Sequence, residues 1–316
     1  MKVLVTDKSA EEALQVLKDA GHDLTYDEMD AETLLKEIPK YDALMVRSRT
    51  KVITEVVNAG AKGNLKVIGR AGIGVDNIDI KTAAKHGIPV VNSPSGATAS
   101  VAELAFAHML ALLRFISKAD NTMKKGEWAK KQLKGMELIG KTLGLIGSGG
   151  IAQHAAKIGN GFGMEVLVYS PHCTEEKAKK MGAKLATFED LLKQSDFVSL
   201  HIPHTEKSHY LIDEKALSLM KNTAYLIDVS RGGVVNQEAL YNALKEGKIA
   251  GAGIDVFEKE PPENNPFVDL DNVILSPHIG ANTKEGQIKA GTVCADQINM
   301  VLAGKTPDFC VNKHML

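Results

Sequence analysis

The sequence is poor in the features that mark several protein classes. Its three cysteines show no C-x-x-C spacing, which argues against a disulfide framework or a zinc site. Lys and Arg total 38 against 39 Asp and Glu, so no basic excess points to nucleic acid. The N-terminal apolar run is too short for a signal peptide, and the most apolar segment, 101–116, is interrupted by Glu103, His108 and Arg114. We therefore expect a cytoplasmic protein without a metal site, a nucleic-acid partner or a membrane span.

Short apolar segments alternate with segments of helical periodicity along the 316 residues, which are enough for two domains. This alternation predicts an α/β fold with parallel sheets covered by helices on both faces. Ser100-Val-Ala-Glu103 predicts a capping box at the start of one of the helices. Strands are expected at 2–6, 43–47, 66–69, 89–92, 143–146, 165–169, 197–201, 224–228, 252–255 and 273–275. Helices are expected at 10–20, 31–38, 52–61, 79–86, 100–118, 151–161, 175–181, 189–193, 214–219, 237–245 and 283–302.

A glycine-rich turn, Gly147-Ser-Gly149-Gly150-Ile-Ala152, joins the predicted strand at 143–146 to the helix that follows. Glycine permits the backbone conformation of such a turn, and the helix N-terminus offers unpaired N–H groups to a pyrophosphate. The spacing is that of the dinucleotide fingerprint G-x-G-x-x-G/A. The position where an Asp or Glu usually binds the ribose 2′-hydroxyl holds Ser170, which leaves the choice between NAD and NADP open.

The C-terminal helix suggests how the domains are arranged. If the fingerprint region is a compact insert, this helix returns to the first part of the chain. The prediction is then a substrate-binding domain made of residues 1–97 and 284–316, interrupted by a dinucleotide-binding domain of residues 98–283.

Polar residues follow several predicted strands of the second domain. Because ligands bind outside the carboxyl ends of parallel strands, His201, Arg231, Asp255, Glu260 and His278 are candidates for one site. Hydride transfer from a hydroxy acid needs a base, a cation for the oxygen or carboxylate, and an acid that orients the base and favours its protonated form. His278, Arg231 and Glu260 fit these three catalytic roles. A lone histidine after a strand is usually structural, but the joint occurrence of the three favours catalysis.

Three segments carry a resemblance to a known family. Asp228-Val-Ser-Arg-Gly-Gly, Asp255-Val-Phe-Glu-Lys-Glu-Pro-Pro and Ser276-Pro-His-Ile-Gly are similar to the Arg, Glu and His motifs of NAD(P)-dependent D-2-hydroxyacid dehydrogenases. The resemblance implies two Rossmann- or flavodoxin-like domains, the nucleotide-binding one inserted into the substrate-binding one, and a homodimer formed through the nucleotide domains. It also implies a set of cofactor contacts: Gly147, Gly149, Gly150, Ile151, Ser170, His201, Ile202, Pro203, Val229, Ser230, Arg231, Asp255, His278 and Gly280.

Within that family, segments 46–52 and 69–77 are most similar to the branch that oxidises 3-phosphoglycerate to 3-phosphohydroxypyruvate in serine synthesis. The turn Gly72-Ile73-Gly74 can direct N–H groups at a carboxylate. Arg47 and Arg70 end neighbouring predicted strands and could bracket a phosphate. In the family a basic residue of the partner subunit can join them, and Lys130, with Lys131 and Lys134 nearby, matches that position; these lysines could equally form a solvated helix face.

Two departures from the family pattern bear on the cofactor. Ser170 does not repel a 2′-phosphate as Asp would, and His172 or Lys177 could contact one, but no Arg follows as in dedicated NADP sites. NAD is therefore the expected cofactor, with NADP use left open. Gly150 stands where relatives often carry Arg beside the pyrophosphate.

Two alternative functions stay open. The nearer is a reductase of another 2-keto acid, such as glyoxylate, hydroxypyruvate or a sulfonated lactate. The more distant is an NAD-sensing binding protein similar to some corepressors, against which the intact set of Arg231, Glu260 and His278 argues. Since the sequence ends at Leu316, feedback inhibition through the serine-sensing domain of longer relatives is not expected.

Overall fold

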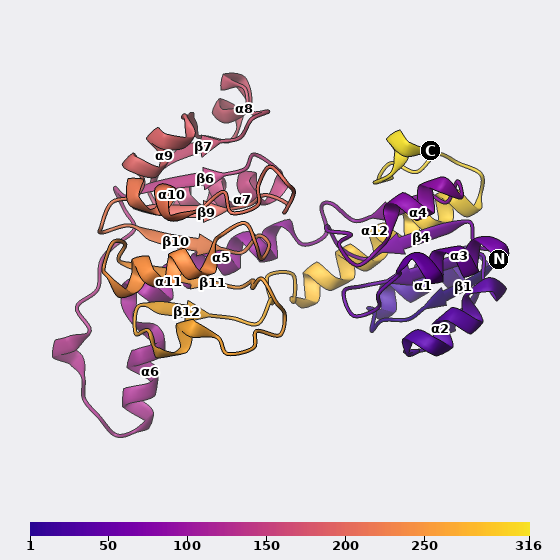
Figure 1. Ribbon diagram of the computed structural model, residues 1–316, viewed down its shortest axis with the longest axis horizontal. Coiled ribbons are helices and arrows are strands. Elements are labelled where there is room, and N and C mark those ends of the chain that lie inside the picture. The colour runs from indigo at the N-terminus through magenta and orange to yellow at the C-terminus, as the bar shows by residue number, and fades with distance from the viewer. The chain divides into compact units, whose positions relative to one another are not determined.

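A computed structural model describes residues 1–316, which divide into two compact units. Unit 1 comprises Met1–Thr98 and Ala281–Leu316, and unit 2 comprises Ala99–Gly280 (Figure 1). These limits fall within three residues of the domain boundaries expected from the sequence. Each unit is built on its own sheet.

Unit 1 has a five-stranded parallel sheet in the order β2-β1-β3-β4-β5, a doubly wound order typical of flavodoxin-like folds. Helix α12 (Lys284–Leu302) packs against α1 and β4, so the last part of the chain completes this unit. Its strands are β1 (Lys2–Val5), β2 (Asp23–Tyr26), β3 (Ala43–Val46), β4 (Val67–Arg70) and β5 (Val90–Asn92). Its other helices are α1 (Glu11–Asp19), α2 (Ala31–Glu37), α3 (Thr54–Lys62) and α4 (Ile80–Lys85), with short 3-10 turns at Ile38–Lys40 and Lys313–Met315.

Successive residues of the unit 1 strands enter different cores. Leu4 and Leu44 pack in one apolar cluster, whereas Val3, Val5 and Met45 pack in another. Since neighbouring side chains on a strand point to opposite faces, both faces of the sheet are buried. This double burial explains the uninterrupted apolar runs in the sequence.

Unit 2 has a seven-stranded parallel sheet in the order β12-β11-β10-β9-β6-β7-β8. The chain begins this sheet at β6 and adds β7 and β8 on one side of it. It then crosses to the other side of β6 to form β9, so the direction of winding reverses between β6 and β9, as in Rossmann folds. The strands are β6 (Thr142–Ile146), β7 (Glu165–Tyr169), β8 (Lys184–Leu185), β9 (Phe197–Leu200), β10 (Tyr225–Asp228), β11 (Gly251–Ile254) and β12 (Val273–Leu275). The helices are α5 (Thr98–Arg114), α6 (Ile116–Lys124), α7 (Gly150–Gly161), α8 (Glu175–Lys180), α9 (Phe188–Gln194), α10 (Glu214–Leu219) and α11 (Gln237–Lys245), with 3-10 turns at Lys130–Gln132 and Pro266–Asp269. The predicted fold class is therefore confirmed.

Three local predictions were wrong. Strands β2 and β8 were not expected, because both lie at sheet edges and lack the apolar runs of central strands. Helix α5 (Thr98–Arg114) begins at Thr98, so Ser100 lies inside its first turn and not at the N-cap. The helix also ends before the expected limit, at Phe115, where φ is 52°, and α6 (Ile116–Lys124) follows in a new direction.

No single helix is both long and apolar enough to cross a membrane. Only α5 and α6 together, with a 62° bend between them, reach the length and composition of a span.

Candidate active site

The glycine turn between β6 and α7 has the open geometry that a dinucleotide needs. At Gly147, where φ is 115°, a Cβ would lie 2.4 Å from the backbone oxygen of His201, so a side chain does not fit. A Cβ built at Gly149 would meet nothing within 4 Å, and no side chain caps the N-terminus of α7. The first amides of α7, from Gly150 and Ile151, have no acceptor within the helix and no side-chain cap, so the turn fits a pyrophosphate.

The other expected cofactor-contacting residues follow the carboxyl ends of neighbouring strands of this sheet. Ser170 follows β7, His201-Ile202-Pro203 follows β9, Val229-Ser230-Arg231 follows β10, Asp255 follows β11, and His278 and Gly280 follow β12. The sheet thus brings these positions to one edge, next to the point where the direction of winding reverses. Ligands bind at this edge in open α/β sheets.

His201 supports the turn more than it offers chemistry. Its N–H donates to the oxygen of Ile146 at 2.8 Å, and its ring Nε2 is 3.0 Å from Ser199 Oγ. Ring atom Nδ1 is buried without a partner. Burial lowers the pKa of His201 to about 4, so the ring is neutral at physiological pH.

Asp228 organises the turn that carries Arg231. Its Oδ1 accepts hydrogen bonds from the Ser230 N–H at 3.0 Å and the Ser230 hydroxyl at 2.7 Å. Burial raises the pKa of Asp228 to about 7; the Ser230 hydrogen bonds and the Arg231 charge oppose this effect, and the Asp255 charge adds to it. Arg231 Nη1 donates to the oxygen of Ser230 at 2.7 Å, which folds the guanidinium back over its own turn.

His278 and Glu260 form a direct pair. His278 Nδ1 lies 2.7 Å from Glu260 Oε2, and the other carboxylate oxygen accepts the N–H of Phe257 at 3.0 Å. Burial raises the pKa of Glu260, but the hydrogen bonds from His278 and Phe257 and the charges of His278 and Arg231 outweigh it, so the pKa is lowered overall. The His278 and Glu260 side chains remain 44% and 37% exposed, so a substrate can reach them. The structure thus brings His278 and Glu260 into contact, and it places Arg231 close enough for its charge to lower the pKa of Glu260.

A hydrogen-bonded network behind His278 was missed in the sequence. Asp255 is buried and accepts the Ser276 hydroxyl at 2.6 Å and the N–H groups of Ile279 and Gly280 at 2.9 Å each. The backbone oxygen of Asp255 accepts the N–H of His278 at 2.8 Å. These bonds hold the loop around His278, whose φ of 52° lies in the left-handed region that disfavours a residue with a side chain.

His108 on α5 extends this network, with its Nε2 2.9 Å from Ser276 Oγ. Since the Ser276 hydroxyl donates its hydrogen to Asp255, Nε2 of His108 must be the donor to Ser276. Burial lowers the pKa of His108 more than the Asp255 charge and a Gly253 carbonyl raise it, so the ring is neutral. A polar residue interrupting an otherwise apolar helix was the only signal in the sequence.

The residues expected to bind substrate all lie in unit 1. Val46 and Arg70 are paired across the neighbouring strands β3 and β4, so Arg47 and Arg70 sit at adjacent strand ends. Arg47 Nη1 donates to the oxygen of Lys8 at 2.8 Å, and Arg70 lies over Gly72, where a Cβ would be 1.6 Å from its Nη1. The oxygens of Gly72 and Ile73 accept bonds from Ser93 and Asn92, whereas the N–H groups of Ile73 and Gly74 donate to no acceptor within the chain. This turn can therefore receive an anion.

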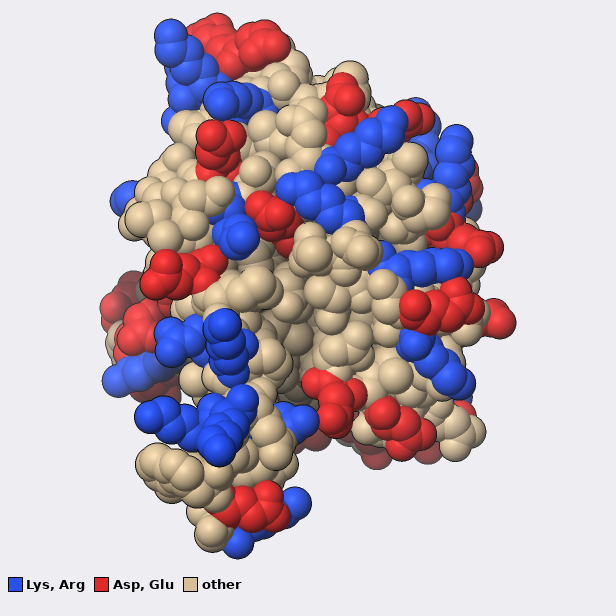
Figure 2. Space-filling model, turned by 90° about the vertical axis from the view of Figure 1, so that its left-hand side faces the viewer, with Lys and Arg blue, Asp and Glu red and all other residues tan.

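Acidic and basic side chains are interspersed over the face shown in Figure 2. No group of three or more His, Cys, Asp or Glu side chains is placed to hold a metal ion.

Comparison with known proteins matches residues 106–280 to the D-isomer specific 2-hydroxyacid dehydrogenase, NAD binding domain. The chain is 46% identical over 313 residues to D-3-phosphoglycerate dehydrogenase of Methanocaldococcus jannaschii, covering 99% of this chain but only 59% of that protein. It is 42% identical over 301 residues to hydroxypyruvate reductase of Thermotoga maritima, covering 94% of this chain and 97% of that one.

Among solved structures, an acyclic imino acid reductase in complex with NADPH and D-Arg superposes with a TM-score of 0.87 at 30% identity. The match covers 98% of this chain and all of the other. Together with the fold and the strand-end residues, these similarities establish that the chain belongs to the D-isomer-specific 2-hydroxyacid dehydrogenase family, whose members are oxidoreductases with an NAD-binding domain.

Proposed function

We propose that the protein is an NAD(P)-dependent D-2-hydroxyacid dehydrogenase. The observation that carries this proposal is the 2.7 Å pair of His278 and Glu260, within reach of the Arg231 charge, on the sheet edge that also holds the glycine turn. A dehydrogenase needs a proton acceptor, an acid that orients it and a cation beside a nucleotide site. All three lie in one unit of this protein.

The His278 tautomer follows from the pair. Because ionised Glu260 can only accept, Nδ1 of His278 carries the hydrogen and Nε2 is free to take the hydroxyl proton of the substrate. A nicotinamide cofactor held by the glycine turn and the strand-end residues would supply the hydride acceptor for the C2 hydrogen in the oxidation, and the hydride donor in the reverse reaction. Arg231 holds the carboxylate or the C2 oxygen, and Glu260 stabilises the imidazolium by its opposite charge. In the reverse direction His278 returns the proton to the oxygen.

The proposed substrate is 3-phosphoglycerate, oxidised to 3-phosphohydroxypyruvate. Arg47 and Arg70 at adjacent strand ends supply the planar cations that suit a phosphate, and the free N–H groups of Ile73 and Gly74 suit a carboxylate. The relative from M. jannaschii, named a D-3-phosphoglycerate dehydrogenase, supports this choice.

Hydroxypyruvate reduction is the second candidate, because the T. maritima reductase is matched over nearly its whole length. Initial rates with 3-phosphoglycerate, phosphohydroxypyruvate, hydroxypyruvate and glyoxylate, each with both nicotinamide cofactors, separate the two. A preference for the phosphorylated pair that Arg47→Ala and Arg70→Ala abolish supports the first proposal. Equal rates on hydroxypyruvate in these variants and the wild type support the second, and no turnover of any of these acids refutes both.

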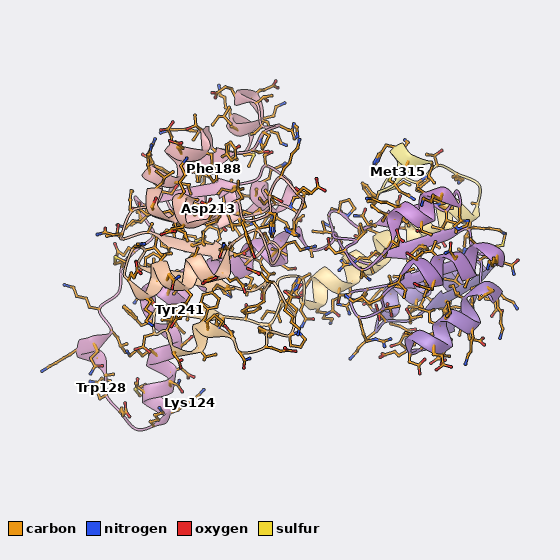
Figure 3. All side chains as sticks on the ribbon, in the orientation of Figure 1. Lys124, Trp128, Phe188, Asp213, Tyr241 and Met315 are labelled. Atoms are coloured by element: carbon orange, nitrogen blue, oxygen red, sulfur yellow. The ribbon has the colours of Figure 1, made fainter.

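We further propose that two copies pair through an arm of unit 2, residues 115–139. In Figure 1, α6 and the segment after it project from the rest of the unit, and Figure 3 places Lys124 and Trp128 near the outer end. No residue of α6 is buried. The arm exposes six large apolar side chains: Phe115, Ile116, Met123, Trp128, Met136 and Ile139. Such a cluster is typical of an interaction surface.

Light scattering after size exclusion tests the dimer. The wild type should elute with twice the mass of the chain, and the double variant Trp128→Ser, Ile139→Ser should shift towards the monomer. Val268→Ser, which changes a side chain of similar 68% exposure outside the arm, is the matched control. A monomeric wild type would contradict the proposal.

A further inference from the structure

A cluster of polar side chains lies beside the glycine turn, at the end of β7. The N–H of Gly147 donates to the oxygen of Tyr169 at 2.8 Å, which ties the turn to the last residue of that strand. Ser148 and Ser170 each follow one member of this bonded pair. In dinucleotide folds this is where the adenosine ribose lies, and the residue in the place of Ser170 contacts its 2′-oxygen.

Lys177 reaches into this cluster from α8. Its Nζ donates to the buried hydroxyl of Ser148 at 3.0 Å, and Thr174, which caps α8, accepts the N–H of Lys177 at 3.2 Å. The ammonium makes no ion pair, whereas Lys180 in the same helix is paired with Glu176 at 2.7 Å. Lys177 therefore presents an uncompensated positive charge at the ribose position.

The cluster also lacks the negative charge that normally excludes a 2′-phosphate. The residues after β7 are Ser-Pro-His-Cys-Thr, with no carboxylate before Glu175. A serine hydroxyl can donate to a phosphate oxygen, and an ammonium is a strong partner for it. The two hydroxyls and Lys177 together supply three donors without an opposing acid.

From this geometry we infer that Ser148, Ser170 and Lys177 form a subsite for the 2′-phosphate of NADP(H), so that the protein binds both nicotinamide cofactors. The inference rests on the proposed dehydrogenase function, which supplies the nucleotide. It makes Lys177 a specificity-determining residue that contacts the cofactor far from the reacting carbon.

Binding of NADPH and NADH, followed by the fluorescence of the reduced nicotinamide, tests the inference without turnover. Lys177→Ala removes a charge-assisted hydrogen bond to the 2′-phosphate. The variant should therefore bind NADPH about 10- to 100-fold more weakly, and its affinity for NADH should change by no more than about twofold. Ser170→Asp should lower the affinity for NADPH, by repulsion of the 2′-phosphate, and should not lower the affinity for NADH, because the carboxylate can accept the ribose 2′-hydroxyl. Lys180→Ala, which removes a paired lysine of the same helix, should change neither affinity.

The outcomes separate this inference from the proposed function. If both variants lose affinity for NADPH but not for NADH, and their unfolding temperatures are unchanged, the result supports the subsite. Equal weakening of both cofactors in Lys177→Ala assigns that residue to the shared pyrophosphate and overturns the inference. A wild type that binds NADH but not NADPH also overturns it, while the dehydrogenase proposal stands. A wild type that binds neither cofactor refutes both.

Discussion

Replacing Asp228 with asparagine should stabilise the protein at alkaline pH and have little effect in acid. Asp228 is buried at the end of β10 and keeps its two hydrogen bonds from Ser230 through one oxygen, which an asparagine side chain also possesses. The substitution therefore preserves the shape and the acceptor but removes the charge that burial disfavours. The difference in folding stability between the wild type and the variant therefore measures the free-energy cost of burying the Asp228 charge.

The size and sign of the effect follow from the pKa of Asp228. Burial raises it from 3.8 to about 7, a difference of about three, and each pKa unit corresponds to about 1.36 kcal/mol. The folded protein holds this proton more tightly than the unfolded chain. The resulting stabilisation, about 4 kcal/mol, is fully present below pH 3.8 and is lost as the pH rises through about 7. Between pH 5 and pH 8 the wild type should lose roughly 2 to 3 kcal/mol that the variant keeps.

Thermal unfolding followed by circular dichroism at pH 5 and pH 8 measures this difference. For a unit of this size, the difference in unfolding temperature between the variant and the wild type should be about 4 to 12 °C larger at pH 8 than at pH 5. Asp79→Asn is the control: hydrogen bonds from Thr54 and Thr82 lower the pKa of Asp79 to about 2, so it is ionised at both pH values. A shift for Asp228→Asn that is the same at both pH values would show that the protonation of Asp228 does not change between them, and a pKa of about 7 would be wrong.

The remaining predictions concern catalysis and share one assay, steady-state kinetics combined with NADH binding. His278→Ala should lower kcat about 10²- to 10⁴-fold with NADH affinity unchanged, and near-normal turnover would remove His278 from the mechanism. Glu260→Gln, which keeps the shape but not the charge, should lower kcat about 10- to 100-fold, and an unchanged kcat would show that the charge is dispensable. His108→Leu should lower kcat several-fold by freeing Ser276, and His108→Gln, which restores a donor, should recover it; failure of this rescue would mean that His108 acts only by packing.

The strands and the candidate catalytic residues could be predicted because both depend on simple rules. Central strands of a parallel sheet are buried on both faces, so β3 is an uninterrupted apolar run and β9 is apolar except for the buried Ser199. Since their carboxyl ends meet at one edge, residues far apart in sequence, such as Arg231 and His278, could be assigned to one site before their positions were known. The glycine turn could be predicted because only glycine fits the conformation at Gly147.

What could not be predicted depends on contacts between distant elements. β2 and β8 form only because a neighbouring strand offers hydrogen bonds at a sheet edge, and their own sequences carry no apolar pattern. The place of His108 depends on Gly253 in β11, where a Cβ would lie 2.7 Å from the histidine Cβ and Nδ1. The absence of a side chain on one strand therefore decides whether a helix can bring its histidine to Ser276. No local pattern encodes such a match.

The two buried aspartates at adjacent strand ends have different tasks because their partners differ. Asp228 receives hydrogen bonds only from Ser230, and its raised pKa keeps it partly protonated near neutral pH. Asp255 accepts from Ser276 and from the amides of Ile279 and Gly280, all in the segment that carries His278. A left-handed backbone at a residue such as His278 costs about 1–3 kcal/mol. The bonds to Asp255 offset this cost by holding the backbone on both sides of His278, so Asp255 positions the segment and Glu260 orients the imidazole.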